Sequence, residues 1–311
     1  MAAYLELYYS GELKKRIEVA KSLLESCSVC PRHCGVNRLS GEVGKCRTSR
    51  EAIVSSYGPH FGEEAPLVGK HGSGTIFFTN CNLRCLFCQN YSISQLGEGE
   101  KVGKEELAYM MLSLQNKGCH NINLVSPTHV VPQILEALGV AVESGLHLPL
   151  VYNSGGYDSV ETLRILDGVI DIYMPDMKYS DEEIAKELSG IEHYPSVNKA
   201  AVKEMHRQVS DLQISPDGIA QRGLLVRHLV LPNNLAGTED VVSFLAREIS
   251  PETYVNIMAQ YHPCYKAFRI PGLTRRVSPT EFQEALKLAH KAGLSRLDKA
   301  RPMEILRLRS E

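Results

Sequence analysis

The chain has 311 residues, and its 34 Lys and Arg against 36 Asp and Glu give a formal net charge of −2. A charge so close to balance provides no global field that would favour nucleic acid or an anionic membrane surface as a partner. No apolar run is long enough to span a bilayer, and the start of the chain lacks the basic and apolar regions of a signal peptide, so we expect a cytoplasmic protein.

The first predicted element is a charged helix over residues 4–26, with apolar residues at helical spacing. It leads into Cys27, Cys30 and Cys34, and Cys46 follows after eleven intervening residues. Clustered cysteines in a reducing compartment indicate metal ligation more than a disulfide framework. Four of them suffice for a tetrahedral zinc site or for an iron–sulfur cluster, and both metals fit the pattern.

Residues 50–73 are rich in Gly, Pro and acidic residues, and we expect them to be irregular. They would connect the N-terminal part to the first buried strand. We therefore predict two regions, a cysteine-rich metal module over residues 1–72 and a core domain over residues 73–311.

From Gly74 onward, predicted strands alternate with predicted helices. The strands are expected at 76–79, 121–125, 148–152, 169–174, 224–231 and 253–258, and the helices at 103–117, 132–144, 158–166, 181–188, 195–209, 238–248 and 279–292. Six β/α units predict a parallel sheet covered by helices. Ligands of such sheets gather at the carboxyl ends of the strands. The basic residues of 299–309 are expected to end a solvated helix.

The first of these strands runs directly into Cys81, Cys85 and Cys88. Three thiolates on one tight loop make a sulfur-rich pocket suited to iron–sulfur chemistry. Three cysteines alone leave one iron of a 4Fe–4S cluster without a protein ligand. The alternatives are a zinc site or three buried free thiols.

A Cys-x3-Cys-x2-Cys run after a first strand, with the aromatic Phe87 just before its last cysteine, resembles the radical S-adenosylmethionine (SAM) superfamily. The resemblance implies a partial (β/α)6 barrel of the TIM type. It also implies that Cys81, Cys85 and Cys88 hold a 4Fe–4S cluster whose open iron is chelated by SAM. One-electron reduction would then cleave SAM to a 5′-deoxyadenosyl radical that abstracts a hydrogen atom, with Phe87 near the adenine.

The second strand ends in Ser126-Pro127-Thr128-His129. Radical SAM proteins often carry a Gly-Gly-Glu turn here that receives the SAM amino group, and this chain lacks it. Ser126 or Thr128 is expected to substitute for that turn, and His129 is a candidate to face the substrate.

The third and fourth strands end in Asn153-Ser154 and in Met174-Pro175-Asp176-Met177-Lys178. These runs resemble the pyruvate formate-lyase activating enzyme, in which such residues surround the SAM methionine and a monovalent cation. The resemblance implies Asn153, Ser154, Asp176 and the Met174 carbonyl as cation ligands and Lys178 as a contact of SAM. Oxygen ligands suit a hard cation, and a lysine offers a point charge to an anion.

The fifth strand carries Arg227, and a Tyr-His pair that ends in His262 follows the sixth. In the activating enzymes both positions lie near SAM, so the resemblance makes Arg227 and His262 candidate SAM contacts. One feature departs from that family. The activating enzymes carry a histidine seven residues after the lysine, and this chain has Ala185 there, with His193 out of register. The N-terminal cysteine pattern resembles a branch of activating-enzyme-like radical SAM proteins.

The expected function is reductive SAM cleavage followed by hydrogen abstraction from a protein or peptide, including activation of a glycyl radical enzyme. The alternatives are modification of a small molecule or peptide without a glycyl radical, and a metal-binding protein without catalysis. A flavodoxin or ferredoxin is the expected one-electron donor. Neither nucleic acid nor membrane is an expected partner.

Overall fold

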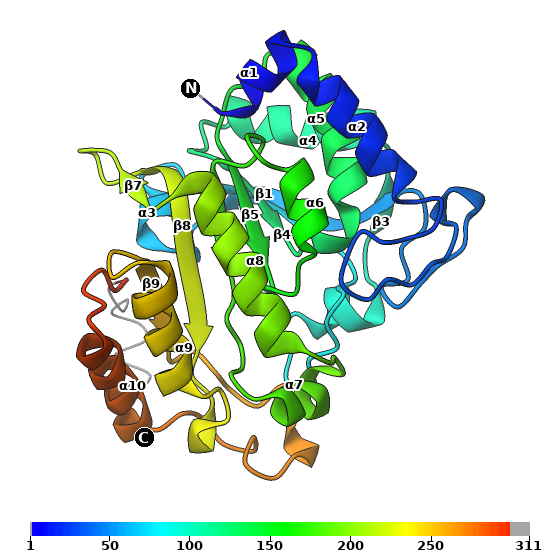
Figure 1. The fold of residues 1–311 in the computed structure, drawn as a ribbon. Coiled ribbons are helices and arrows are strands. Elements are labelled where there is room, and N and C mark those ends of the chain that lie inside the picture. Colours follow the sequence, from blue (N-terminus) through cyan, green and yellow to red (C-terminus); the bar gives the residue numbers. More distant parts are fainter. Residues whose placement is uncertain (1, 299–311) are drawn as a thin grey trace.

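A computed structural model describes residues 2–298 as an α/β fold built on one nine-stranded mixed sheet (Figure 1). Six strands are parallel and follow one another in the order of the sequence. They are β2 (Ser73–Phe78), β4 (Ile122–Val125), β5 (Leu150–Ser154), β6 (Ile172–Pro175), β8 (Ala220–Leu229) and β9 (Tyr254–Met258). These six strands confirm the predicted β/α units.

The other three strands are antiparallel, so the expectation of a purely parallel sheet is wrong at its edges. They are β1 (Ala52–His60), β3 (Glu100–Val102) and β7 (Gln213–Ile214). The pairing runs from β3 through β1 and β2 to β8, with β9 paired to β8. Within residues 2–298 the two ends of this order do not pair with each other. The sheet is therefore open and is not closed into a barrel.

The segment of residues 50–73 was expected to be irregular, and it instead forms β1 and the short helix α3 (Ala65–Val68). Gly58 and Pro59 hide the strand in the sequence, because both residues are rare in strand interiors. The strand forms because β2 pairs with one of its edges and β3 with the other. It lies before residue 73 and pairs with β2, so the sheet crosses the boundary expected between the two regions.

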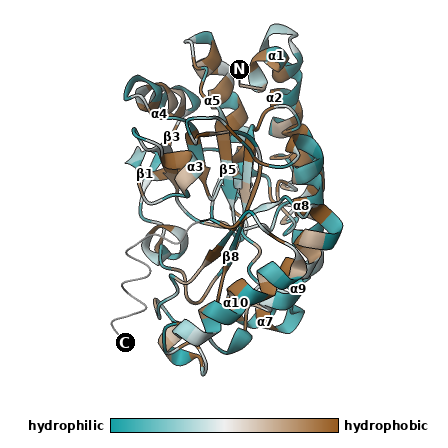
Figure 2. Cartoon of the chain, turned by 90° about the vertical axis from the view of Figure 1, so that its left-hand side faces the viewer, coloured by the Kyte–Doolittle hydropathy of each residue, from teal (hydrophilic) through white to brown (hydrophobic). Residues whose placement is uncertain are grey.

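Helices cover the sheet (Figure 1). They are α1 (Tyr4–Tyr9), α2 (Glu12–Ser22), α4 (Lys104–Asn116), α5 (Val131–Glu143), α6 (Val160–Ile165), α7 (Glu182–Ser189), α8 (Tyr194–Val209), α9 (Thr238–Phe244) and α10 (Pro279–Ala292). Apolar residues gather along the sheet and on α5, which buries nine of its side chains (Figure 2). No helix in the described part of the chain combines the length and the apolar character that crossing a bilayer requires.

The single helix expected over 4–26 is divided into α1 and α2. Gly11 separates them with φ +76°, a left-handed conformation that glycine adopts without steric cost. After α2, residues 27–50 form loops around a short 3-10 turn at Arg38–Ser40. In Figure 1 this blue loop region lies beside the cyan segment that follows β2. The basic tail expected to end a helix at 299–309 lies outside the described residues.

Candidate functional site

The loop after β2 carries three cysteines, and each sulfur has a polar neighbour. The Leu83 N–H donates to Cys81 Sγ (3.4 Å), and the Ser189 hydroxyl donates to Cys85 Sγ (3.0 Å). The Ser94 hydroxyl lies 3.1 Å from Cys88 Sγ. Hydrogen-bond donors aimed at sulfur favour thiolate over thiol. For Cys85, burial outweighs this effect and its pKa lies above the ordinary value, so a bound metal would be needed to draw off the proton.

Backbone hydrogen bonds attach this loop to two remote parts of the chain. The Arg84 and Leu86 N–H groups donate to the carbonyls of Ser189 and Leu188 at the end of α7 (3.0 and 2.8 Å). The Lys266 N–H donates to the Leu86 carbonyl (2.8 Å). The position of the cysteines is therefore fixed by tertiary contacts and not by the loop alone.

The thiols of the loop influence one another electrostatically. Burial raises the pKa of Cys81 to about 12, and the neighbouring Cys85 thiol adds to the effect. As the side chains lie, no three His, Cys, Asp or Glu groups within residues 2–298 are arranged to hold a metal ion. The residue types nevertheless fit an iron–sulfur cluster, because three cysteines line the same cavity and sulfur is the ligand that such clusters require.

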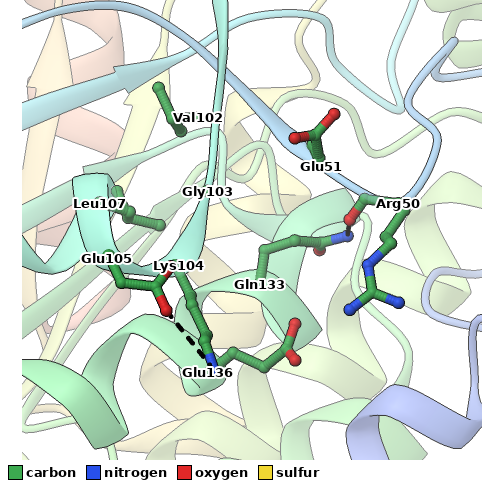
Figure 3. Close-up of a pocket in the computed structure, with 9 residues that line it drawn as sticks. All are labelled: Arg50, Glu51, Val102, Gly103, Lys104, Glu105, Leu107, Gln133 and Glu136. Carbon is green, nitrogen blue, oxygen red and sulfur yellow. Dashed lines mark hydrogen bonds and ion pairs between the residues drawn. The ribbon is translucent and has the colours of Figure 1, made fainter.

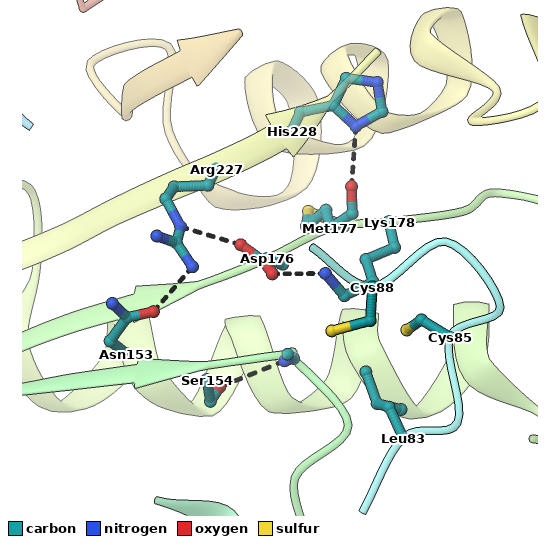
Figure 4. Close-up of polar contacts among 12 residues, drawn as sticks. Leu83, Cys85, Cys88, Asn153, Ser154, Asp176, Met177, Lys178, Arg227 and His228 are labelled. Atoms are coloured by element: carbon teal, nitrogen blue, oxygen red, sulfur yellow. Dashed lines mark hydrogen bonds and ion pairs between the residues drawn. The ribbon is translucent and has the colours of Figure 1, made fainter. Parts of the chain in front are cut away.

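A cavity of about 150 Å³ lies between the cysteine loop and the carboxyl ends of the parallel strands. The three cysteines line one side, and Figure 4 shows Cys85 and Cys88 facing the strand ends. The polar residues on the opposite side were expected at this place from the sequence: Ser126, Asn153, Ser154, Asp176, Lys178 and Arg227. The fold brings residues from four predicted strand ends to one cavity.

Asp176 is the centre of the charges in this cavity. Its Oδ1 accepts from Arg227 Nε (2.8 Å) and its Oδ2 from Lys178 Nζ (2.5 Å). Arg227 also donates to Asn153 Oδ1 (2.7 Å), as Figure 4 shows. All three charged side chains are at most one-fifth exposed.

Two cations share one carboxylate at the cavity wall, and Glu63 and Glu64, which lie outside the lining, also act on the charge of Arg227. Burial alone would raise the pKa of Asp176, but Arg227 and Lys178 hold it below its ordinary value. For Lys178, burial works against the charge, and Asp176 together with Cys85 keeps its pKa above the ordinary value. All three groups are therefore charged at neutral pH. Arg227 is also compensated by Glu63, so Lys178, which within residues 2–298 pairs with Asp176 alone, is the cation more available to an anionic ligand.

Thr128 and Ser154 point to Asp158, a residue that the sequence analysis did not select. The Asp158 carboxylate accepts hydrogen bonds from the hydroxyls of Thr128 (2.7 Å), Tyr152 (2.9 Å) and Ser154 (2.6 Å). Thr128 is buried and does not line the cavity, whereas Ser154 does. The buried Asp158 thus fixes the two strand ends relative to each other.

His129, Phe87 and His262 lie outside the cavity lining. His129 is buried, with its Nε2 3.1 Å from the Thr79 carbonyl. The Phe87 ring packs edge-on against Tyr179 and Tyr261. His262 lies beside the cysteine loop, with its Nδ1 3.3 Å from Gln89 Nε2.

The N-terminal cysteines form a second set of neighbouring thiols. Burial raises the pKa of Cys30 to about 12, and the thiols of Cys46, Cys27 and Cys34 contribute to the effect. The Lys45 N–H donates to Cys34 Sγ (3.5 Å). Four sequence positions spread over twenty residues are thus brought close enough to interact.

Another cavity, of about 200 Å³, lies beside the start of α4 and one face of α5 (Figure 3). Its wall mixes both signs of charge, including Arg50, Lys104, Glu105 and Glu136. Lys104 and Glu105 pair across 3.7 Å. No cysteine or histidine lines it, so it offers no soft metal ligand, and we assign no chemistry to it.

Sequence reasoning missed Ser94, Asp158 and Ser189. Ser189 stands 104 positions from the cysteine that it contacts, and no local pattern links the two. Ser94 follows Cys88 by only six residues, but serine is too common for its spacing to be a signal. Only the position of Asp158 shortly after a predicted strand end could have drawn attention.

Comparisons with known proteins agree with this arrangement. The sequence model of the "Radical SAM superfamily" matches residues 75–245. An uncharacterized protein of Methanocaldococcus jannaschii, MJ0674, is 33% identical over 299 residues, which are 93% of this chain and 82% of that protein. A second uncharacterized protein of the same organism, MJ0808, is 25% identical over 86% of this chain and 78% of its own length.

Among solved structures, a radical SAM methyltransferase from Sphaerobacter thermophilus is similar in fold. It aligns with a TM-score of 0.51 over 74% of this chain and 67% of its own, at 14% sequence identity. At this identity the likeness supports the open α/β fold alone and carries no information on the substrate.

Proposed function

Because the chain belongs to the radical SAM superfamily, we propose that it is an enzyme that cleaves SAM at a 4Fe–4S cluster held by Cys81, Cys85 and Cys88. When bound, such a cluster supplies the electron that splits SAM into methionine and a 5′-deoxyadenosyl radical. The observation that carries the proposal is the shared cavity. Three sulfur ligands line the same cavity as two cations, Lys178 and Arg227, that share Asp176 at the strand ends.

The chain's own residues account for the placement of SAM. Its methionine part carries a carboxylate, and Lys178 and Arg227 offer two cations that already share Asp176. The cavity of about 150 Å³ is smaller than the roughly 300–1,000 Å³ of small-molecule sites. We propose that Lys178 turns from Asp176 to the SAM carboxylate when the ligand enters, which widens the cavity at the same step.

The remaining expected contacts belong to this proposal as well. Ser126 and Asn153 line the cavity and offer polar atoms to the SAM amino group or to a monovalent cation. As the side chains lie, both Asp176 oxygens are engaged by Arg227 and Lys178, so a cation at Asp176 would also require one of these to move. Phe87, Thr128 and His262 lie behind or beside the cavity and would act by supporting its walls.

The test is SAM cleavage by the anaerobically reconstituted protein. Wild type with SAM and dithionite should form 5′-deoxyadenosine, and Cys85→Ala should form none and lose the SAM-responsive spectral signal. Cys119→Ala is the matched control, because Cys119 is a buried thiol outside both cysteine sets. A brown, iron-loaded wild type whose spectrum does not respond to SAM would overturn the proposal.

For the substrate, we propose a protein or peptide, with a flavodoxin or ferredoxin as electron donor and the cytoplasm as the place of action. Support comes from the Asn153-Ser154 and Asp176-x-Lys178 runs, which resemble activating enzymes and line one cavity. If a glycyl radical enzyme is the partner, incubation with SAM and reductant should give a doublet glycyl radical in electron paramagnetic resonance (EPR) spectra. SAM cleavage without that radical on any candidate would reject this version.

One observation favours the alternative, which is modification without a glycyl radical. The position at which activating enzymes present a histidine is Ala185, and its side chain is completely buried on α7. It therefore offers nothing to a docking partner. Transfer of deuterium from labelled extract fractions into 5′-deoxyadenosine, traced by mass spectrometry, would identify a small-molecule fraction and decide between the two.

A further inference from the structure

The two cysteine-bearing loops are joined by hydrogen bonds between residues next to their cysteines. Arg47 follows Cys46 and donates to the side-chain oxygen of Asn80, which precedes Cys81 (2.9 Å). Arg32 lies between Cys30 and Cys34 and donates to the carbonyl of Asn82 (2.6 Å).

A third contact runs in the opposite direction between the same two loops. Arg84 lies between Cys81 and Cys85 and donates to the carbonyl of Lys45, the residue before Cys46. The two sets of thiols are thus neighbours through three separate connections. Each connection is only one or two residues away from a cysteine at both of its ends.

The joint between the loops is unusually rich in positive charge. Arg32, Arg47 and Arg84 lie close enough for the first two to act on the charge of the third. Their hydrogen bonds go to carbonyl and amide oxygens, and no carboxylate in the described part of the chain forms an ion pair with them. Arg84 directly precedes Cys85 and contacts the carbonyl of the residue before Cys46, so a cysteine of each loop lies near this contact.

Three neighbouring guanidinium groups without a carboxylate repel one another. Arg47 is exposed and Arg32 and Arg84 are half-buried, so water screens part of this repulsion, and negative charge on either side would offset the rest. Metal centres ligated by cysteine thiolates carry net negative charge and would supply it from both sides. The joint therefore fits two loaded centres better than one loaded centre and four free thiols.

We propose that Cys27, Cys30, Cys34 and Cys46 hold a second iron–sulfur cluster, which passes electrons through the arginine joint to the cluster at Cys81, Cys85 and Cys88. This inference rests on the proposed function for the second half of that path. One electron moves from a low-potential flavodoxin or ferredoxin to the N-terminal centre and then to the SAM-binding centre. No bond forms or breaks, and the donor is the species oxidised.

The spacing and the contacts both favour iron–sulfur over zinc. Cysteine-only zinc sites draw their ligands as two separated close pairs. Here three cysteines are close and one is remote, an arrangement that plant-type ferredoxins share, although with other intervals between the three close cysteines. Zinc is also redox-inert. With zinc at the N-terminal cysteines, the hydrogen-bonded path from Cys46 through Arg47 and Asn80 to Cys81 could carry no electron.

The metal is tested first, on full-length protein purified anaerobically, by elemental analysis and EPR. A triple variant with Cys81, Cys85 and Cys88 changed to Ala should retain roughly two to four iron atoms and a reduced-state signal that SAM does not alter. A Cys30→Ala/Cys46→Ala variant should lose that iron and keep the SAM-responsive signal, and Cys119→Ala should keep both.

The triple variant also tests the second cluster independently of the proposed function, because its iron content and EPR signal do not depend on SAM cleavage. Zinc in that variant, or no metal at all, would overturn the second cluster even if wild type cleaves SAM. If the double variant does not fold, the triple variant still gives the answer.

The relay is tested next, by stopped-flow reduction of the SAM-binding centre. With reduced flavodoxin, Arg47→Gln should slow this reduction about tenfold, equivalent to about 1.4 kcal/mol in barrier, at unchanged iron content. With dithionite, which reaches either centre directly, SAM cleavage should stay near wild type. The matched control is Arg16→Gln, because Arg16 on α2 also donates to backbone carbonyls but far from this joint. An equal loss with both reductants would show a structural role only and reject the relay.

Discussion

At the scale of single residues, Asp176 is the carboxylate on which the charges of the cavity centre. It holds Arg227 and Lys178 together, and the pair of cations would repel each other strongly in this buried place without it. The two cations are not equivalent. Arg227 has a further partner in Asn153, whereas Lys178 Nζ has Asp176 alone among its hydrogen-bonded side chains in the described chain. Lys178 is therefore the side chain that is free to change partners.

Replacement of this lysine gives the first prediction. Lys178→Gln should weaken SAM binding about tenfold or more, because a charged hydrogen bond to a carboxylate contributes roughly 1.5–3 kcal/mol. Iron content should stay at the wild-type level, since Asp176 keeps Arg227. Titration of the cluster's EPR signal with SAM measures the affinity. Lys203→Gln, which breaks a half-exposed pair with Glu248, is the control, and equal affinity in both variants would contradict the assignment.

The sequence indicates the cysteines and the charged residues at this scale because they stand at strand ends or at a specific spacing. It does not indicate their supports. Ser189 and Asp158 are ordinary residue types whose roles appear only when α7 and the β5–α6 turn meet the cysteine loop and the strand ends. Side chains that act through tertiary contacts leave no local pattern.

At the scale of elements, the turn between β5 and α6 is the most constrained connection near the site. Gly156 has φ +73°, and a Cβ at this position would lie 2.1 Å from the Asp176 carbonyl oxygen. The carbonyls of both residues accept from Asn198, whose side chain closes the same corner. The turn therefore sets how close the ends of β5 and β6 can be.

Gly156→Ala should destabilise the protein by more than about 3 kcal/mol, because steric overlap with backbone is added to the strain of positive φ. Gly218→Ala is the matched control. Gly218 also has positive φ, +81°, but a Cβ there would meet nothing within 4 Å. Gly218→Ala should lower the free energy of unfolding by only roughly 1–2 kcal/mol, the cost of a strained backbone. Urea unfolding of both variants measures the difference, and equal losses would contradict the expected overlap.

Asp171 gives a pH dependence that belongs to the start of β6. Its carboxylate accepts from the N–H groups of Ala3 and Leu150, and burial raises its pKa to about 6. An unfolded aspartate titrates near 3.9. Between these two values the folded state holds more protons than the unfolded state, so stability falls as pH rises from about 4 to about 6.

The titration of Asp171 should lower the free energy of unfolding by roughly 3 kcal/mol between pH 4 and pH 6. Asp171→Asn removes the titration, so the difference in free energy of unfolding between wild type and variant should shrink or change sign as pH rises from 4 towards 6. Denaturant unfolding at several pH values measures this difference. A difference that does not change with pH would contradict the raised pKa.

The elements also show where sequence patterns succeed and where they fail. The six parallel strands are short apolar runs between helices. Because such strands are buried on both faces, their sequences are almost continuously apolar and can be recognised. Strand β1 carries Ser55, Ser56 and Pro59, and only two of its nine residues, Ala52 and Val54, are buried. It exists because of its partners β2 and β3, which a local window does not include.

At the scale of the whole molecule, the N-terminal part is built into the core. Tyr4 and Leu13 are buried in the main apolar cluster, and Arg38 donates to the His129 carbonyl (2.8 Å). Strand β1 pairs with β2 across the boundary expected at residue 72. The division into a module over 1–72 and a core domain over 73–311 stays a prediction. The contacts just described indicate that the two regions fold together and not separately.

We therefore expect one cooperative thermal transition for the metal-free protein. Differential scanning calorimetry should give a single peak whose calorimetric and van't Hoff enthalpies agree. Two resolved peaks, with the lower one lost on removal of residues 1–50, would instead show that the N-terminal part unfolds independently.

The backbone connections of the loop after β2 also determine when the protein can mature. Its partners are at residues 188, 189 and 266, so a chain still leaving the ribosome has the three thiols long before it has the scaffold that arranges them. Iron and sulfide delivered at that stage would meet a loop without defined geometry. We therefore expect a defined cluster geometry only after residue 266 has left the ribosome, so that delivery would act on a largely folded chain rather than on a nascent segment.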